Sequence, residues 1–249
     1  PELKNKGIVI GAFDPEGCAA CPGPQNGYRN GTMYSSYTAA VFARPPLIAE
    51  QHGVNLEGAL TWAFEFEDQP YFAGFRALGS NGLDLPVLNV FRMFSRMDGQ
   101  RLAATSSAEV PLAQIVKNGV RDHADVGVVA SRDGHRLSIL VWHYHDDDVA
   151  GPDAAVALAI DGLTPEAGTA LLTHYRVDEN HSNAYTAWKR LGSPIAPDEK
   201  QYAALEQAGQ LATLAAPAPV SIAHGAATLT FTLPRQGVSL LVLELPAGH

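Results

Sequence analysis

Two short stretches of this sequence combine carboxylates with aromatic side chains, a composition that suits the binding of a sugar. The first stretch, residues 12–21, reads AFDPEGCAAC, and the second, residues 62–71, reads WAFEFEDQPY. Aromatic rings stack on the faces of pyranose rings, while carboxylates bind sugar hydroxyls or act as acids and bases in glycoside cleavage. Each stretch overlaps or follows an apolar run, so we expect both to lie at strand ends and in the loops that follow.

The second stretch supplies the strongest single candidate, Glu65, because a carboxylate inside an apolar run must be paired or functional. We predict that Glu65 and Glu67 contact sugar hydroxyls. Trp62 and Tyr71 are predicted to form the apolar walls of the same site. A salt-bridged structural role is the alternative for Glu65. For Glu67 and its neighbour Asp68, a solvated loop explains the sequence equally well.

The first stretch also carries a C-x-x-C motif formed by Cys18 and Cys21, the two cysteines of the chain. A zinc site would need two further ligands, and neither His52 nor His123 has a metal-like spacing to the motif. A thioredoxin-type motif belongs at the start of a helix, whereas this one lies within a loop rich in Gly and Pro. We therefore expect a local disulfide or a pair of buried thiols, and no metal or organic cofactor.

Strands and helices alternate in the first 99 residues and must position these stretches. The expected elements are strands at 7–13 and 58–66, loops at 14–31 and 67–84, and helices at 33–52 and 86–97. Pro45 and Pro46 should break or restart the first helix. Both strands lack polar alternation, which is typical of strands buried on both faces in a parallel sheet. In parallel α/β barrels, sites lie at the C-terminal ends of the strands, where both candidate stretches are found.

Beyond residue 99 the pattern changes to short strands separated by turn residues, as in an antiparallel β-sandwich. The expected strands cover residues 126–130, 137–144, 155–160, 168–177, 227–233 and 238–245. Asp133 and Gly134 mark a hairpin between the first two. A helix at 198–214 and a short stiff linker at 215–219 interrupt the series. The expected fold is α/β plus all-β, with domains at residues 1–99 and 100–249.

The composition of the chain excludes several classes of function. The 249 residues are 46% apolar and carry 17 Lys+Arg against 26 Asp+Glu, a net charge of −9. Such an acidic chain is not expected to bind nucleic acid, which needs a basic face, and no apolar run approaches the roughly 18 residues of a membrane span. The sequence enters an apolar strand almost at once, without an initiator Met or a signal peptide. We therefore expect it to be the C-terminal part of something longer.

Several longer motifs follow one another along the chain. They are IVIGAFDPEGCAAC at 8–21, YRNGTMYSSYT at 28–38, GALTWAFEF at 58–66 and DENHSNAY at 178–185, followed by Trp188 and by LGSP at 191–194. Together they resemble bacterial β-xylosidases of glycoside hydrolase family 39, and the resemblance covers nearly the whole chain. It implies the last βα units of a TIM (β/α)8 barrel followed by an accessory β-sandwich. It also implies a retaining glycoside hydrolase that releases xylose from the non-reducing ends of xylo-oligosaccharides.

The chain departs from this family at both catalytic carboxylates. The family's acid/base glutamate lies on the fourth barrel strand, and nothing here corresponds to it. Its nucleophile is a glutamate at the end of the seventh strand, and the matching position in this sequence is Ala12. A methyl group cannot attack an anomeric carbon, and Glu16, beyond Pro15, should point elsewhere. The chain by itself is expected to be inactive, with a xylo-oligosaccharide or another β-xyloside and the N-terminal half of the same protein as its partners.

Two alternatives stay open. A non-catalytic carbohydrate- or protein-binding module could use aromatic residues of the sandwich as a stacking surface, although such residues more often belong to a core. The candidates are Trp142, Tyr144, Tyr175 and Trp188. An α-L-arabinofuranosidase on the same scaffold is the nearer rival, because substrate choice depends on loops that mostly lie upstream.

Overall fold

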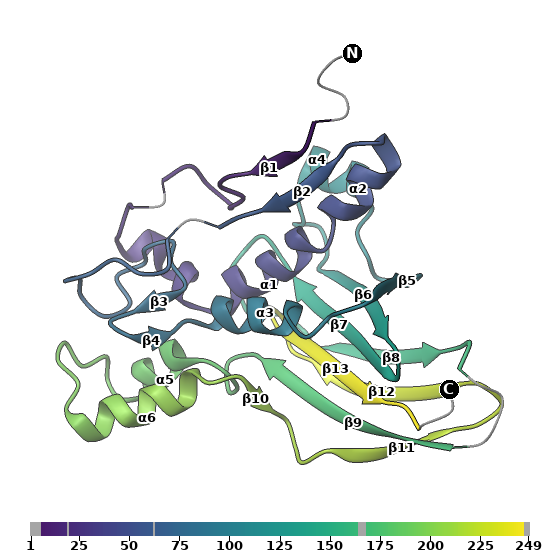
Figure 1. Cartoon of the computed structure of the whole chain (residues 1–249). Helices are drawn as coiled ribbons and strands as arrows, with labels where there is room; N and C mark the ends of the chain where they lie inside the picture. The colour runs from purple at the N-terminus through teal and green to yellow at the C-terminus, as the bar shows by residue number, and fades with distance from the viewer. Residues whose placement is uncertain (1–5, 19, 62, 164–167, 247–249) are drawn as a thin grey trace.

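The first part of the chain forms a parallel pair of strands accompanied by helices. The computed structural model describes residues 6–18, 20–61, 63–163 and 168–246. Its first elements are β1 (Ile8–Ile10), the 3-10 helix η1 (Pro24–Asn30), α1 (Thr32–Phe42), α2 (Pro45–His52), β2 (Leu56–Ala59), β3 (Gly79–Ser80), β4 (Leu83–Asp84) and α3 (Pro86–Phe94). β1 pairs with β2 in parallel, and β3 pairs with β4 in antiparallel fashion (Figure 1).

The predicted order of strand, loop and helix, repeated twice, is confirmed, but both strands are shorter and less buried than predicted. β1 covers three residues in place of 7–13, and β2 covers four in place of 58–66. Ile8 and Val9 are 45% and 54% exposed. A strand is buried on both faces only where other elements cover both faces, and within the described residues β1 has one strand neighbour, β2.

The helices begin where the prolines predict. α1 ends at Phe42 and α2 begins at Pro45, because proline is tolerated in the first turn, where an amide hydrogen has no helical partner. α3 likewise begins at Pro86, but it ends at Phe94 rather than at residue 97. No helix in the described ranges is long and apolar enough to cross a membrane.

The remainder of the chain is built on a large antiparallel sheet, as predicted. Its strands follow the order β10–β9–β13–β7–β6–β5, and β11 also pairs with β9. The bounds are β5 (Gln100–Leu102), β6 (Asp125–Asp133), β7 (Arg136–Tyr144), β9 (Gly168–Val177), β10 (Ala212–Thr213), β11 (Ala218–Ile222) and β13 (Val238–Glu244). A smaller antiparallel sheet pairs β8 (Ala154–Ile160) with β12 (Ala227–Leu233). Gly134, with φ at +54°, makes the tight turn of the predicted hairpin between β6 and β7.

The segments between these strands differ from the prediction in three places. Two short helices, α4 (Leu112–Asn118) and α5 (Ala184–Arg190), are additional. The helix predicted at 198–214 is α6 (Glu199–Gly209), which ends early because the chain turns into β10. The linker at 215–219 is shorter than predicted, since β11 begins at Ala218. Pro219 is tolerated in β11 because this strand pairs on one side only.

Two hydrophobic cores lie on opposite faces of the large sheet. Leu140 and Trp142 of β7 pack with Met93 of α3 and with residues of α1. Ile139 and Val141 point to the other face, where they pack with residues of β8 and β12. This alternation explains why β7 is buried from Leu137 to Tyr144, with helices over one face and a second sheet on the other (Figure 1).

The aromatic residues of the β part do not form one exposed stacking surface. Trp142 and Tyr144 are buried in the core shared with α1 and α3, and Tyr175 packs against that core. Trp188 lies elsewhere, against Phe72, with ring centroids 5.1 Å apart. The stacking surface considered for a non-catalytic module is therefore absent from these four residues.

Burial of His174 in β9 should make the stability of the fold depend on pH. Its ring stacks edge-on against Phe231 and its Nε2 lies 3.0 Å from the Ser239 hydroxyl. Burial, together with the smaller effect of the nearby Arg176 charge, lowers the pKa of the His174 imidazole to about 4. In the unfolded chain the His174 imidazole is protonated near its ordinary pKa of 6.5. Between pH 6.5 and about 4 the unfolded chain therefore binds more protons than the folded chain.

We expect the free energy of unfolding to fall as the pH drops from about 6.5 to about 4, with up to about 3 kcal/mol attributable to His174. His174→Gln, which keeps a hydrogen-bonding group for Ser239, should remove that part of the slope in urea unfolding measured at several pH values. His135→Gln, in the exposed β6–β7 turn, is the control and should leave the slope unchanged. Equal slopes for His174→Gln and the parent protein would contradict the prediction.

Candidate active site

Ala12 lies just past the C-terminal end of β1, whose pairing with β2 already shifts in register between Ile8 and Val9. Leu60 donates its amide to the Ile10 carbonyl at 2.9 Å and accepts the Phe13 amide at 2.9 Å. A regular parallel ladder would join Leu60 to residues two apart, so the chain accommodates one extra residue at Gly11–Ala12. Such bulges redirect side chains at strand ends and are common beside active sites. Phe13 packs against Phe42 of α1 with ring centroids 5.2 Å apart, whereas Ala12 stays exposed.

The Asp14 side chain, two residues after Ala12, is buried and paired. Its Oδ1 accepts hydrogen bonds from the Tyr34 hydroxyl at 2.8 Å and the Thr61 hydroxyl at 2.9 Å. Its Oδ2 lies 3.3 Å from Nε of Arg76, which is also buried. Burial raises the pKa of the Tyr34 phenol, so this hydroxyl remains a hydrogen-bond donor. Asp14 thereby ties the loop after β1 to the end of β2 and to α1.

Glu16 is held in a second polar cluster. Its two carboxylate oxygens contact the Arg29 guanidinium and the Tyr28 hydroxyl. Arg29, itself buried, also donates to the carbonyls of Cys18 at 2.9 Å, Cys21 at 3.1 Å and Gly74 at 3.1 Å. Burial raises the pKa of Tyr28 to about 12. With these partners, Glu16 supports the loop, in agreement with the expectation that it does not replace a nucleophile.

Cys18 and Cys21 form a disulfide, one of the two states expected from the sequence. The bond closes the loop whose carbonyl groups surround Arg29. The disulfide therefore restrains the same loop that Arg29 and its partner Glu16 hold. A structural role follows, because the disulfide stiffens the loop that leads from Ala12 into η1.

Replacement of both cysteines by serine should lower stability without changing which sugar the protein prefers. Loss of the restraint should reduce the free energy of unfolding by about 1–2 kcal/mol, the low end for disulfides because the closed loop is short. Thermal unfolding and competition between xylobiose and cellobiose provide the two readouts. A change in sugar preference with an unchanged melting temperature would point instead to a direct role at the site.

Glu65 lies on the loop after β2 and is paired with a backbone group. Its Oε1 accepts the Gly82 amide at 2.8 Å, and a methyl group added at Gly79 would lie 3.4 Å from its Oε2. The neighbouring Phe64 carbonyl accepts the amides of Leu78 and Gly79, both at 2.8 Å. The half-buried carboxylate thus closes the turn between β3 and β4. Among the residues that the structure covers, the partner of the Glu65 carboxylate is this backbone amide and not a cationic side chain.

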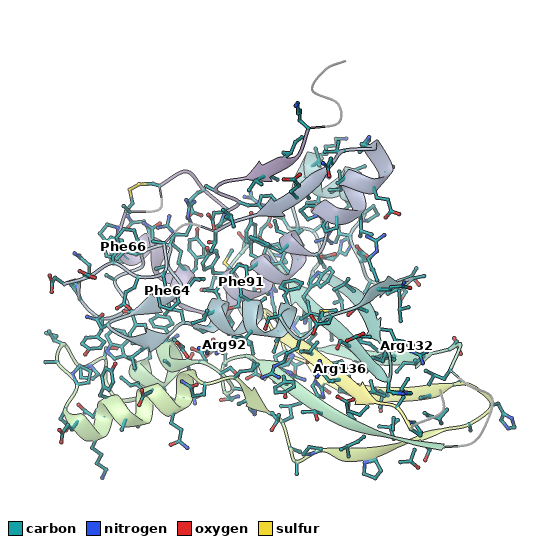
Figure 2. The ribbon with its side chains drawn as sticks, in the orientation of Figure 1. Phe64, Phe66, Phe91, Arg92, Arg132 and Arg136 are labelled. Atoms are coloured by element: carbon teal, nitrogen blue, oxygen red, sulfur yellow. A yellow bond between two sulfur atoms is a disulfide. The ribbon has the colours of Figure 1, made fainter. Side chains whose placement is uncertain are left out.

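The other predicted sugar contacts occupy different environments. Glu67 is exposed, and Tyr71 is half-buried beside Phe72, with ring centroids 6.4 Å apart. Trp62 lies outside the described residues. Figure 2 shows Phe64 and Phe66 at the same end of the molecule as the disulfide, opposite Arg132 and Arg136 of the β6–β7 hairpin. Whether these side chains contact sugar stays a prediction.

Sequence reasoning missed the residues that organise this region. Tyr34, Thr61, Arg29 and Arg76 bind the two carboxylates that follow Ala12. Two of them, Arg29 and Tyr34, lie in the YRNGTMYSSYT motif. A charged Arg29 directly before a largely uncharged helix could have indicated a buried cation that needs a carboxylate partner. Burial of Arg76 depends on how the loop after β2 folds back, which no local pattern contains. In the ranges covered by the structure, no cluster of three or more His, Cys, Asp or Glu side chains could hold a metal ion.

Comparison with known proteins gives one family match and several related structures. The family model described as "Glycosyl hydrolases family 39" matches residues 3–225. Mouse "Alpha-L-iduronidase" is 30% identical over 125 residues, which are 47% of this chain and 18% of that protein.

Three solved structures have a similar fold. A bacterial orthologue of human α-L-iduronidase aligns over 100% of this chain and 43% of its own, with a TM-score of 0.79 and 18% identity. The GH39 enzyme of Xanthomonas axonopodis pv. citri aligns over 92% and 44%, with a TM-score of 0.68 and 17% identity. A monomeric β-xylosidase of Caulobacter crescentus CB15 aligns over 92% and 44%, with a TM-score of 0.67 and 18% identity. The chain therefore spans less than half the length of each.

Proposed function

Because this chain belongs to glycosyl hydrolases family 39, a family of glycosidases, we propose that it is the C-terminal portion of a retaining β-xylosidase. In this proposal β1 and β2 are the last two strands of a TIM (β/α)8 barrel, and the antiparallel sheets form the accessory β-sandwich. The likeness in fold to the Caulobacter crescentus β-xylosidase supports it, as does the span of less than half of that protein. The substrate is a xylo-oligosaccharide or another β-xyloside, and the partner is the N-terminal half of the same protein.

The observation that carries the proposal is the position of Ala12. It is exposed at the bulged end of a parallel strand, where a retaining glycosidase on this fold would place its nucleophile. Retention of configuration needs two carboxylates about 5–5.5 Å apart, one to attack the anomeric carbon and one to move the proton. Asp14 and Glu16 are occupied by buried partners, so neither supplies the missing attack. We propose that this chain contributes a sugar pocket and no covalent step.

Four side chains are proposed to contact the sugar. Glu65 and Glu67 accept hydrogen bonds from its hydroxyls, and Trp62 and Tyr71 stack beside the ring. The firm anchoring of Glu65 to the Gly82 amide supports this role, because a carboxylate fixed by a backbone group presents its remaining lone pairs in a constant direction.

A binding experiment tests the proposal separately from catalysis. We expect the 249-residue chain to bind xylobiose in isothermal titration while aryl β-xyloside hydrolysis stays at background. Glu65→Gln keeps an acceptor for Gly82 but loses the charge, and it should weaken binding about tenfold. Glu244→Gln, at the exposed end of β13, is the matched control and should bind as the parent chain does. Absence of any binding to xylobiose would refute the proposal.

An α-L-iduronidase is a second candidate, favoured by the match to the mouse protein. An iduronide carries a carboxylate, and a buried site for that group needs a cation to pair with it. Among the described residues, the buried Arg29 and Arg76 contact the two carboxylates that follow Ala12, so Glu16 and Asp14 already pair with them. This arrangement favours an uncharged sugar. Tighter binding of an aryl α-L-iduronide than of the matching xyloside would reverse the order of the two candidates.

A further inference from the structure

The loop after β2 adopts a costly backbone conformation at three residues. Asp68, Phe72 and Asn81 have φ values of +55°, +52° and +53°. The left-handed region is uncommon for side chains other than Gly, Asn and Asp, and for a bulky residue such as Phe it is a genuine outlier. Such conformations cost on the order of 1–3 kcal/mol each and persist only where the surroundings enforce them. The contacts around Phe72 should therefore reveal what fixes this loop.

Hydrogen bonds hold the backbone of Phe72 on both sides. Its amide donates to the Ser80 hydroxyl at 2.8 Å, which joins it to the other arm of the loop. Its carbonyl accepts the side-chain amide of Asn30 at 2.8 Å, and Asn30 is buried at the end of η1. The Gln69 carbonyl accepts the Asn81 side-chain amide, also at 2.8 Å, and joins the two arms a second time.

Packing from the β part of the chain holds the ring of Phe72, which is only 6% exposed. Its centroid lies 5.5 Å from that of Tyr185 and 5.1 Å from that of Trp188, both on α5. Tyr185 and Trp188 stack on each other with centroids 6.0 Å apart. From α6, the Tyr202 hydroxyl donates to the Asn81 carbonyl at 3.1 Å. Figure 1 shows α5 and α6 beside β3 and β4, at the end of the molecule that carries the candidate site.

The DENHSNAY motif fixes α5 in turn. Asp178 accepts the amides of Asn180 at 2.8 Å and His181 at 2.9 Å, and Asn183 caps α5 by accepting the Thr186 amide at 2.9 Å. Ser182, with φ at +55°, donates its hydroxyl to the Arg176 carbonyl of β9 at 2.7 Å. The large sheet thus sets the direction in which α5 presents its aromatic pair.

We propose that Tyr185 and Trp188 are positioning residues for the sugar site. Through Phe72 they hold the 65–85 loop in the conformation that presents Tyr71 and Glu65. Tyr71 directly precedes Phe72, and Glu65 is bonded to Gly82 on the arm that Ser80 joins to Phe72. A shift of the Phe72 ring would displace both candidate sugar contacts. The sugar part of this inference rests on the proposed function, whereas the bracing of the loop does not.

Amide hydrogen exchange of the 249-residue chain tests, without any ligand, whether Tyr185 and Trp188 hold the 65–85 loop. Trp188→Ala should speed exchange about tenfold at the loop amides of Phe72, Leu78, Gly79 and Gly82, with little change in β6 and β7. Trp188→Phe keeps an aromatic ring against Phe72 and should restore most of the protection. Phe231→Ala is the matched control, since it removes an aromatic ring that packs on His174. It should leave exchange in the loop unchanged.

Xylobiose titration supplies the second readout. We expect Trp188→Ala to weaken binding about tenfold and Trp188→Phe to recover it. If loop exchange is faster in Trp188→Ala but neither the parent chain nor any variant binds xylobiose, Tyr185 and Trp188 still hold the loop through Phe72. The proposal that the loop presents sugar contacts is then refuted. Unchanged amide exchange of the loop in Trp188→Ala, or exchange that is faster by the same factor throughout the chain, would show that Trp188 does not hold the loop. Should Trp188→Ala fail to fold, Tyr202→Phe removes only the hydrogen bond to Asn81 and must still speed exchange at Gly82 for the inference to stand.

Discussion

Ala12→Glu is expected to raise the rate of aryl β-xyloside hydrolysis by at least about 10³-fold in a chain that also carries the upstream half of the barrel. The substitution returns a carboxylate to the exposed, bulged end of β1. A rate increase of this size corresponds to about 4 kcal/mol of transition-state stabilisation, the scale of a restored covalent nucleophile. Initial rates with a chromogenic xyloside give the measurement.

Two control variants separate nucleophilic attack from a simple change of shape. Ala12→Gln has nearly the volume of glutamate but cannot form the glycosyl–enzyme ester, so it should remain at the background rate. Ala12→Asp carries the charge on a shorter side chain and should recover much less activity than glutamate. Full hydrolysis with Ala12 in place, or no gain from Ala12→Glu, would mean that the nucleophile lies at another residue.

Small anions offer an independent check on the same position. In that longer chain, azide or formate should partly restore turnover of the Ala12 form, because the missing side chain leaves room beside the anomeric carbon. The azide product should have inverted configuration, since the anion attacks once from the nucleophile's face. Rescue should disappear in Ala12→Gln, whose side chain fills the space.

The sequence predicted elements more accurately than it predicted their environments. Prolines placed the starts of α2 and α3, and the Asp133–Gly134 pair placed the turn between β6 and β7, because these signals are local. The prediction that β1 is buried on both faces was wrong, because an apolar run shows that a strand can be buried but not which neighbours cover it. α5 was missed because its seven residues carry few helix signals apart from the Asn183 cap.

The candidate site shows the same division. The loops after β1 and β2 were found from their carboxylates and aromatic residues. The partners of those carboxylates were not, because Asp14 meets Arg76 and Glu16 meets Arg29 only after the chain has folded back. Glu65 illustrates a further limit. Its apolar surroundings predicted a paired or functional carboxylate, but a backbone amide 17 residues further along the chain is a partner that no side-chain pattern reveals.

The largest stability loss is expected at Asp125, which joins the two parts of the chain. This carboxylate is fully buried in β6 and accepts three hydrogen bonds at 2.7 Å, from the Val110 amide, the Trp142 indole and the Arg44 guanidinium. Arg44 follows α1, and its guanidinium also lies 5.3 Å from the Trp142 ring. Asp125 therefore neutralises a cation from the helical part while satisfying the Trp142 indole of the sheet and the Val110 amide of the segment between β5 and α4.

Asp125→Ala should lower the free energy of unfolding by about 3–5 kcal/mol, because it leaves two N–H groups without acceptors and removes the nearest carboxylate of Arg44. Arg44 then keeps the Ala40 carbonyl at 2.8 Å and the Glu109 carboxylate at 3.5 Å. Arg44→Met should cost less, about 1.5–3 kcal/mol, since Asp125 would keep both N–H donors. Asp98→Ala removes an exposed carboxylate 3.8 Å from Arg136 and should change stability by no more than about 0.5 kcal/mol. Urea unfolding followed by tryptophan fluorescence measures all three. A loss for Asp125→Ala as small as that for Asp98→Ala would show that water reaches the freed groups and that Arg44 does not depend on this carboxylate.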